Sequence, residues 1–347
     1  MCGTVKNRRA HTRRFAASLA YAALAICLLG GNIHLALAQP VSGPGSTANE
    51  PSVRTPAKRP VAPVKPGLRG TPVAAIAKPA TVAPAPVTGP ARVYLFRGAL
   101  GPIFSRGMDS LTKEITDAGV TANVYEFTIC ELVYKEAIEE YKRAPFPIIL
   151  IGHSMGGRCG LMFSEALQAE HIPVSLLVTI DPAHMSPSVP LNVERFINIF
   201  LSKNVLGGGD IKPMPGFQNH YASVDLEQRD EVSHITIDKL DTLHQQLLAK
   251  VLELASTPAK DQGEAIPIRY AVPPKAEIEL WDSGKPVFAQ PGDTLQTIAQ
   301  SYNVPLWSLT QINHMQDNTP LAPGQRVVVP RHLVPLVEDA SAPPPQH

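Results

Sequence analysis

The chain has 347 residues, more than one average domain contains, and 35 of them are proline. A chain of this length and composition is expected to hold two folded units together with unstructured sequence. Its formal net charge is +1, and no expected folded segment carries a clustered basic face. The charge therefore argues against a nonspecific electrostatic role on nucleic acid. We expect a monomer with no nucleic-acid partner.

The N-terminus has the pattern of an export signal. An apolar run at 15–29 follows five basic residues, Lys6, Arg8, Arg9, Arg13 and Arg14. Ala36-Leu37-Ala38 then offers a small-x-small cleavage site. A membrane anchor, the alternative, needs about 20 uninterrupted apolar residues, and Gly30 closes this run earlier. We therefore predict a signal peptide at 1–38 and an exported protein, periplasmic or associated with the cell wall.

Composition divides the rest of the chain. Proline, alanine, valine and threonine dominate residues 39–91, which cannot bury enough apolar surface to offset their ordering entropy. We predict a Pro-rich disordered linker there, a folded domain at 92–256, a second Pro-rich linker at 257–286, a small domain at 287–331 and a disordered tail at 332–347. Because the second linker lacks a sustained apolar period, the two folded modules are expected to be separable.

Buried-strand runs alternate with helical patterns in the first folded domain. Strands are expected at 93–96, 123–127, 146–151 and 174–180, and helices at 108–118, 131–143 and 157–169. Weaker strand candidates at 193–200 and 220–226 are separated by a flexible loop at 206–210, and a helix at 237–254 closes the domain. This alternation predicts an α/β fold with a mostly parallel sheet that is covered on both faces.

The motif that carries chemistry is Gly152-His153-Ser154-Met155-Gly156, which follows an apolar strand directly and opens a helix. Small residues two positions before and after the serine let the turn close tightly, and the strained turn lifts the Ser154 hydroxyl above the sheet. There the helix N-terminus and the Met155 N–H can stabilise a developing negative charge. This context predicts a nucleophilic serine.

With this motif, residues 92–256 resemble a minimal α/β-hydrolase domain of the lipase and esterase superfamily. The resemblance implies a catalytic triad in the chain order Ser, acid, His. It also implies a second oxyanion-hole N–H in the loop after the first strand, at Ala99 or Leu100, beside that of Met155. The implied activity is hydrolysis of a carboxylic acyl ester, although thioesters and amides are cleaved by the same constellation.

His234 is the candidate general base. It lies between the last strand candidate and the closing helix, where the family places this residue. It would take the Ser154 proton and return it to the leaving group. The other downstream histidines fit less well, since His244 lies inside the helix while His184 and His220 come before the expected point.

Asp181 is the candidate acid because it directly follows the buried strand at 174–180. This position resembles the acid turn of secreted lipases that use the strand after the nucleophile helix. Asp181 would hold the His234 tautomer and stabilise its imidazolium. Asp210 and Asp225 remain alternatives.

The residues suggest neither a metal site nor a cofactor. No histidine pair has His-x-x-x-His spacing on a helix, and the two cysteines beyond the signal are too far apart for a zinc clip. Export would permit a disulfide between Cys130 and Cys159. Both lie in expected helices, where a free cysteine is most often a buried apolar residue. The sequence therefore leaves open whether the two cysteines form a disulfide or stay free.

The small C-terminal domain resembles a LysM module. The resemblance is carried by 291–295, Ile298-Ala299, 302–305, Leu309, Ile312-Asn313, 321–325 and 327–330. Leu295, Ile298, Ala299 and Tyr302 make one apolar helix face. Asp293 can cap this helix. Two short strands at 286–289 and 326–329 would flank two helices in a βααβ domain.

By resemblance, such a module binds peptidoglycan or other glycans that contain N-acetylglucosamine, in a shallow groove between two loops. The candidate glycan-binding residues are Gly292, Asp293, Thr294, Leu295, Asn313, His314 and Met315. The whole chain is thus predicted to be a serine hydrolase held at the cell wall. The alternative is a peptidoglycan-binding scaffold protein whose hydrolase fold is catalytically inactive.

Overall fold

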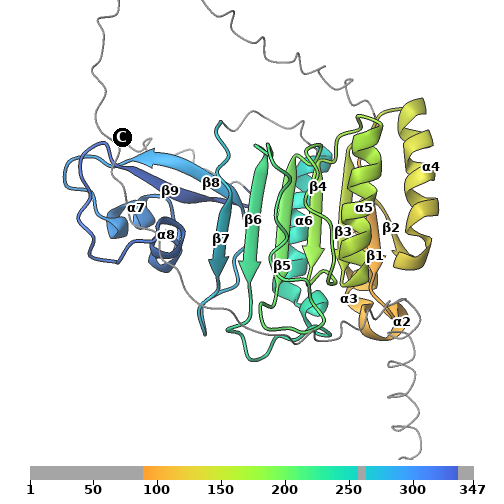
Figure 1. The fold of residues 1–347 in the computed structure, drawn as a ribbon, viewed down its shortest axis with the longest axis horizontal. Helices are drawn as coiled ribbons and strands as arrows, with labels where there is room; N and C mark the ends of the chain where they lie inside the picture. The colour runs from red at the N-terminus through yellow and green to blue at the C-terminus, as the bar shows by residue number, and fades with distance from the viewer. Residues whose placement is uncertain (1–88, 257–262, 335–347) are drawn as a thin grey trace, which may run out of the picture. The chain divides into compact units, whose positions relative to one another are not determined.

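The computed structural model describes residues 89–256 and 263–334, so the expected signal peptide and nearly all of the expected first linker lie outside the described residues. Most of the described chain is built on a sheet with the order β2-β1-β3-β4-β5-β6-β7, in which all neighbouring strands are parallel (Figure 1). The strands are β1 (Arg92–Arg97), β2 (Thr121–Glu126), β3 (Ile148–His153), β4 (Leu176–Ile180), β5 (Arg195–Phe200), β6 (His220–Asp225) and β7 (Ile268–Ala271).

Helices cover both faces of this sheet. They are α2 (Gly101–Phe104), α3 (Arg106–Asp117), α4 (Cys130–Arg143), α5 (Met155–Ala169) and α6 (Asp241–Ser256), with short 3₁₀ helices η1 (Phe127–Ile129) and η2 (Ile237–Lys239). In Figure 1, α4 and α5 lie in front of the sheet, and α3 and α6 lie behind it. Within the described ranges, no helix is long and apolar enough to cross a membrane.

The side chains of β1 show how the two layers divide the core. Val93 and Leu95 pack with α3 and α6, whereas Tyr94 and Phe96 pack with α4 and α5, because successive side chains of a strand point to opposite faces. The central strand β3 is buried along its whole length, as expected where helices cover both faces. The predicted α/β fold class is therefore confirmed.

Cys130 and Cys159 form a disulfide, which answers the question that the sequence left open. Cys130 is the first residue of α4, and Cys159 lies in the first half of α5. Both belong to the apolar cluster between these helices and the sheet. The bond thus ties α4 to the helix that begins beside Ser154.

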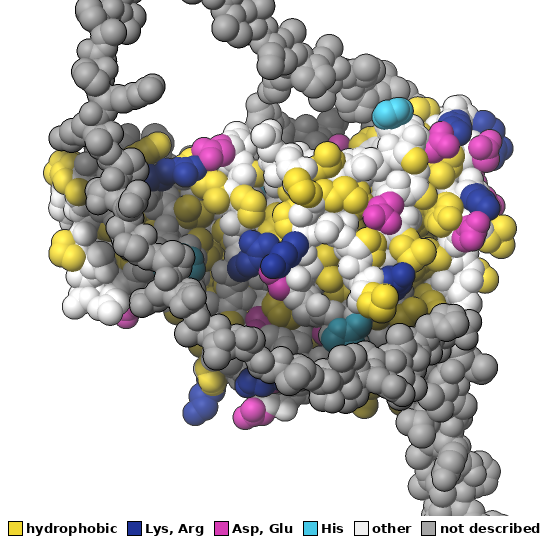
Figure 2. Space-filling view, in the orientation of Figure 1, with side chains coloured by type: hydrophobic (Ala, Val, Ile, Leu, Met, Phe, Trp, Pro, Cys, Tyr) yellow, Lys and Arg dark blue, Asp and Glu magenta, His cyan; other side chains and the backbone are white. Residues whose placement is uncertain are grey.

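The α4 and α5 face carries charges of both signs. Figure 2 shows Lys or Arg and Asp or Glu side chains interspersed among hydrophobic and uncharged ones on this face. Two of the ion pairs join Lys135 to Glu131 and Lys142 to Glu170. Where described residues form it, this face therefore presents no extended field of one sign to a polyelectrolyte.

The C-terminal residues form the predicted βααβ domain. Its elements are β8 (Trp281–Phe288), α7 (Leu295–Ser301), α8 (Leu306–Asn313) and β9 (Arg326–His332), and the two strands are antiparallel. Leu295, Ile298, Leu309 and Val327 belong to its own apolar core. This part of the predicted fold class is confirmed as well.

Three details of this domain differ from the expectation. The first strand begins at Trp281, and β9 runs to His332, one residue into the expected tail, with Leu333 buried after it. The N-cap of α7 is Thr294, in a reciprocal capping box with Thr297. Asp293, the predicted cap, instead accepts a backbone N–H from the preceding turn. In this capping box each threonine side chain accepts the backbone N–H of the other, so two N–H groups at the start of the helix are satisfied at once. A carboxylate one position earlier, at Asp293, does not do this.

The linker predicted at 257–286 is wrong for its described part. Residues 268–271 form β7, which pairs with β6 as the last strand of the sheet, and Trp281 is fully buried in the core. Pro267 and Pro273 flank β7 so closely that no strand period stands out in the sequence. Such prolines are tolerated beside a short edge strand.

The βααβ domain packs against this edge strand. Gln311 of α8 donates from Nε2 to the Ala271 carbonyl at 3.0 Å, and its Oε1 accepts the Ala271 N–H at 2.9 Å. One side-chain amide thus pairs with the strand edge as a neighbouring backbone would. The ring of Trp307 lies 5.5 Å from that of Trp281, which lies 4.2 Å from Tyr270. The two folded modules therefore pack against each other, which argues against the expectation that they are separable.

We predict that a chain ending at Ser256 folds poorly. It lacks β7 and Trp281, and the loss of one large buried aromatic side chain alone costs about 3–5 kcal/mol, a large part of the stability of an ordinary domain. Thermal unfolding followed by circular dichroism, with limited proteolysis, should show a broad transition and rapid cleavage. A chain ending at Val334 is the control and should unfold like the full-length protein. Equal melting temperatures for the two shortened chains would contradict the prediction.

Candidate active site

Ser154 lies in a tight turn between β3 and α5. Its φ of 56° and ψ of −121° are rare for a residue with a side chain and mark a strained backbone. A Cβ on Gly152 would lie 2.2 Å from the Gly156 carbonyl oxygen, and one on Gly156 would lie 2.1 Å from that of Phe96. Because neither position has room for a side chain, the Gly-x-Ser-x-Gly spacing is a steric requirement of this turn.

The structure brings the three predicted triad residues together. His234 Nε2 lies 3.1 Å from Ser154 Oγ, and His234 Nδ1 lies 2.7 Å from Asp181 Oδ2. Since a carboxylate only accepts, Nδ1 carries the proton and donates it to Asp181, and the Ser154 hydroxyl donates to Nε2. Ser154 is 8% exposed and Asp181 is fully buried. This is the order of hydrogen bonds through which an imidazole can take the proton of a serine.

The Asp181 carboxylate is held by donors from the segment after β5. Its Oδ1 accepts the Leu201 N–H at 3.3 Å, and its Oδ2 accepts an N–H of the Asn204 side chain. A Cβ on Gly207 would lie 2.3 Å from Asp181 Oδ1, so this loop needs glycine to close over the acid. The loop at 206–210 that the sequence suggested as flexible is thus packed on the acid turn, where Gly208 N–H donates to Pro182 O at 2.5 Å.

The alternative candidates are bonded elsewhere. Asp210 pairs with Arg269, and Asp225 accepts the backbone N–H of Ser202. Groups outside the candidate triad are also the partners of the three alternative histidines, His184, His220 and His244. Within residues 89–256 and 263–334, no group of three or more His, Cys, Asp and Glu side chains is arranged to hold a metal ion.

Both expected oxyanion segments are adjacent to Ser154. Met155 is the first residue of α5, so its N–H has no acceptor within the helix. A Cβ on Gly98 would lie 2.7 Å from Ser154 Cβ, so the chain that leads into Ala99 and Leu100 touches the nucleophile. Leu100 then turns the chain back in a left-handed conformation, with φ of 54°, before α2.

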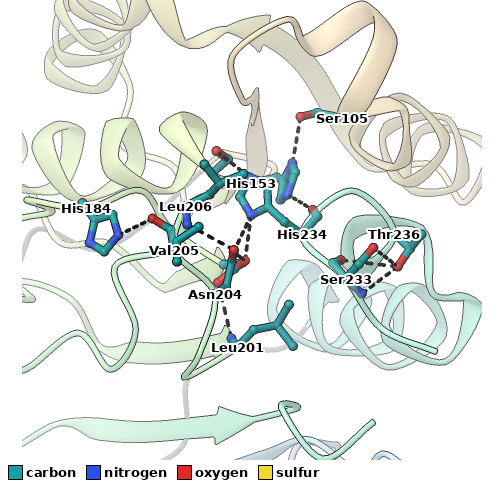
Figure 3. Close-up of polar contacts among 12 residues, drawn as sticks. Ser105, His153, His184, Leu201, Asn204, Val205, Leu206, Ser233, His234 and Thr236 are labelled. Carbon is teal, nitrogen blue, oxygen red and sulfur yellow. Dashed lines mark hydrogen bonds and ion pairs between the residues drawn. The ribbon is translucent and has the colours of Figure 1, made fainter. Parts of the chain in front are cut away.

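His153, which the sequence analysis did not select, links this loop to the base. Its buried ring packs against the ring of His234, with 4.9 Å between centroids. Its Nε2 lies 2.8 Å from the His234 carbonyl oxygen, and its Nδ1 lies 2.7 Å from Ser105 Oγ (Figure 3). The Gly98 N–H donates to the same Ser105 oxygen at 3.0 Å.

The protonation of His153 sets the direction of these bonds. Burial, and after it the charge of His234, lowers the pKa of His153 to about 4, so its ring is neutral at neutral pH. A carbonyl only accepts, so Nε2 carries the single ring proton and Nδ1 accepts from the Ser105 hydroxyl. One continuous chain of hydrogen bonds therefore runs from the Gly98 N–H to the backbone of His234.

The candidate glycan residues lie at two turns of the βααβ domain. Residues 292–294 precede α7, with φ of 92° at Gly292, and the exposed His314 follows α8 with φ of 54°. Leu295 is instead fully buried. The Asn313 side chain accepts from the Val328 N–H at 2.7 Å and donates to the Val328 carbonyl at 2.8 Å. Leu295 and Asn313 thus hold the domain together with their side chains, which are not free to contact a sugar.

Comparison with known protein families identifies this domain. Residues 289–330 match the LysM domain family. The match covers the helices α7 and α8 and most of β9. Domains of this family bind glycans that contain N-acetylglucosamine. The match thus begins directly after β8 and ends two residues before the end of β9.

Solved structures similar to the chain include hydrolases. One is assigned to the α/β superfamily of hydrolases, from Xanthomonas campestris pv. campestris, with 15% identity and a TM-score of 0.25 over 36% of this chain and 76% of that one. Another is the NocB thioesterase domain in covalent complex with a fluorophosphonate nocardicin G analogue. It has 14% identity and a TM-score of 0.29 over 49% of this chain and 96% of that one. A second structure of the NocB thioesterase domain, from the nocardicin cluster, has 13% identity and a TM-score of 0.27 over 49% of this chain and 94% of that one. The search of curated proteins found no match.

We predict that the hydrogen bonds of His153 speed the reaction of Ser154 with a fluorophosphonate. His153→Phe keeps a ring of similar size but removes both bonds and leaves two groups unpaired, at about 1–3 kcal/mol. Lost from the transition state, that free energy corresponds to roughly 5- to 160-fold in rate. His153→Gln, whose amide both donates and accepts, should recover part of this loss. Labelling rates give the comparison, and thermal unfolding shows whether each variant is folded. Equal labelling rates for wild type and His153→Phe would refute the prediction.

Proposed function

We propose that the chain is an exported serine hydrolase that cleaves carboxylic esters and is localised to the cell wall by its LysM domain. The observation that carries the proposal is the hydrogen-bonded series from Ser154 through His234 to Asp181 at a strained strand-to-helix turn. A base and an orienting acid in this order turn a weakly nucleophilic hydroxyl into a reactive one. The export signal expected at residues 1–38 supports the proposed location.

In the proposed reaction, His234 takes the Ser154 proton as the oxygen attacks the ester carbonyl, and it returns this proton to the leaving alcohol. Asp181, fully buried beside Nδ1, stabilises the imidazolium that forms. The N–H of Met155 and that of Ala99 or Leu100 would stabilise the negative charge on the carbonyl oxygen. Water then cleaves the acyl-enzyme by the same route, so the chain's own groups supply every step.

The LysM domain would retain the enzyme on peptidoglycan or another glycan that contains N-acetylglucosamine. Exposed groups at the two turns support this assignment, with Gly292 and Thr294 before α7 and His314 after α8. Backbone N–H and C=O groups at such turns can pair with acetamido groups. The proposed location is therefore the periplasm or the cell wall.

Replacing the nucleophile tests the proposal directly. Ser154→Ala removes the attacking oxygen, so we expect no covalent labelling by a fluorophosphonate and a loss of several orders of magnitude in ester turnover. Circular dichroism should show the fold unchanged, because the side chain is small. Full labelling of the variant would contradict the nucleophile assignment. A wild-type protein inert to both probe and ester would favour the inactive scaffold instead.

Replacing the acid separates Asp181 from the two other candidates. Asp181→Asn keeps the shape but favours the wrong His234 tautomer, and we expect turnover to fall on the order of 10⁴-fold. Asp210→Asn and Asp225→Asn should cost far less, because these carboxylates bond to Arg269 and to the Ser202 N–H rather than to His234. Steady-state kinetics on one soluble ester gives the ranking. A larger loss in either comparison variant would move the acid role away from Asp181.

A further inference from the structure

A cavity of about 440 Å³ lies where the LysM domain meets the sheet. Its lining comes from β5, β6, β7 and α8 with the following turn, and includes Phe200, Ser223, Arg269, Ala271, Gln311 and His314. His314 is also one of the candidate glycan residues, and its side chain is exposed. A glycan that contacts His314 therefore shares this space with side chains of the sheet.

The cavity and the nucleophile belong to the same edge of the sheet. All seven strands are parallel, so their carboxyl ends lie along one edge. Ser154 follows β3 there, and the cavity reaches the last residues of β5 and β7, Phe200 and Ala271. With neighbouring strands about 4.8 Å apart, the four steps from β3 to β7 span roughly 19 Å. An oligosaccharide of a few units covers this distance.

The position of the LysM domain along this edge is held at two places. At the carboxyl end of β7, the Gln311 amide pairs with both backbone groups of Ala271. At the amino ends of the strands, Asp282 of β8 lies 2.7 Å from His220 Nδ1 and 3.5 Å from Arg195 Nε. His220 and Arg195 are the first residues of β6 and β5. Asp282 and Arg195 are both buried, and breaking such a pair is costly because it leaves an unpaired buried charge.

The packing of the LysM domain on the sheet bears on the choice of substrate. A domain on a flexible tether would raise the local concentration of enzyme at the wall for any ester found there. A domain packed beside the carboxyl ends of the strands favours hydrolysis of an ester on the polymer that the domain binds. The effective concentration of such an ester at Ser154 is high only if the geometry lets one polymer occupy both sites at once. The guanidinium of the exposed Arg269 and the imidazole of the exposed His314 are hydrogen-bonding groups of the kind that orient sugars in pockets.

We propose that the substrate is an O-acyl ester of the glycan itself, carried on a hydroxyl of the same N-acetylglucosamine-containing chain that the LysM domain binds. This inference rests on the proposed function. In the reaction, Ser154 Oγ bonds to the acyl carbon, the bond from that carbon to the sugar oxygen breaks, and the sugar hydroxyl leaves with the proton from His234. Water then cleaves the acyl-serine, which releases a carboxylic acid and restores the Ser154 hydroxyl.

The first test compares three acetyl esters with the full-length protein: p-nitrophenyl acetate, O-acetylated N-acetylglucosamine, and an O-acetylated pentamer of N-acetylglucosamine. We expect kcat/KM for the pentamer to exceed that for the monomer by about tenfold or more, because only the pentamer spans both sites. Equal values for monomer and pentamer would overturn the inference, while turnover of p-nitrophenyl acetate would still support the proposed function. Failure to hydrolyse any of the three would overturn both.

The second test uses a matched pair of histidines. His314 and His171 both follow a helix, are exposed and are left-handed, with φ of 54° and 57°, so glycine replaces either without strain. His171 precedes β4 and therefore lies at the amino edge. His314→Gly should lower the pentamer-to-monomer ratio of kcat/KM about fivefold or more, whereas His171→Gly should keep the wild-type ratio. An unchanged ratio in His314→Gly would overturn the role of the cavity.

Discussion

The backbone of Ser154 is hydrogen-bonded to the turn that carries Asp181, and the geometry of the site depends on this attachment. Ser154 N–H donates to the Ile180 carbonyl at 2.9 Å, and the Ser154 carbonyl accepts the Ala183 N–H at 3.0 Å. The turns that follow β3 and β4 are thus joined to each other, so the parallel pairing of two strands sets the distance from nucleophile to acid. The missing side chain at Gly156 brings the end of β1 against the same turn.

The base has no such strand to place it. His234 is 80 residues from Ser154 in the chain and lies in a loop between β6 and α6. Two contacts compensate: His153 donates to its carbonyl, and Asp238, further along the same loop, accepts the Gly107 N–H at 2.9 Å. The Asp238 contact reaches α3 directly, and His153, the last residue of β3, reaches the loop before α3 through its bond to Ser105. The base loop and the oxyanion loop are therefore held by one region of the chain.

The three residues of the candidate triad could be selected from the sequence because each has a local signal. Ser154 lies in a motif between a buried strand and a helix, Asp181 ends a buried strand, and His234 precedes the closing helix. Their supporting partners have no such signal. Asn204 and Asp181 are 23 residues apart, and Ser105 and His153 are 48 apart, so these pairs arise only when distant segments meet in the folded chain.

The same limit explains the missed edge of the sheet. The alternation of strands and helices predicted the parallel sheet as far as β6, but β7 has four residues and gains its burial from an aromatic partner outside it. Tyr270 packs on Trp281, 4.2 Å between centroids, and donates from its hydroxyl to the Glu279 carbonyl at 2.9 Å. A segment whose core contacts lie in the following strand reads as a linker when it is considered alone.

The edge strand also explains why the two domains form one unit. A parallel sheet that ended in an uncovered β7 would expose backbone N–H and C=O groups to pairing with other chains. Gln311 covers these groups at Ala271, and Trp307 packs beside the buried Trp281. The LysM domain therefore covers the last strand of the sheet on which the Ser154 turn is built. Because this contact also sets the place of His314 along the carboxyl edge, the stability of the sheet and the direction from which a bound glycan reaches Ser154 depend on the same few side chains.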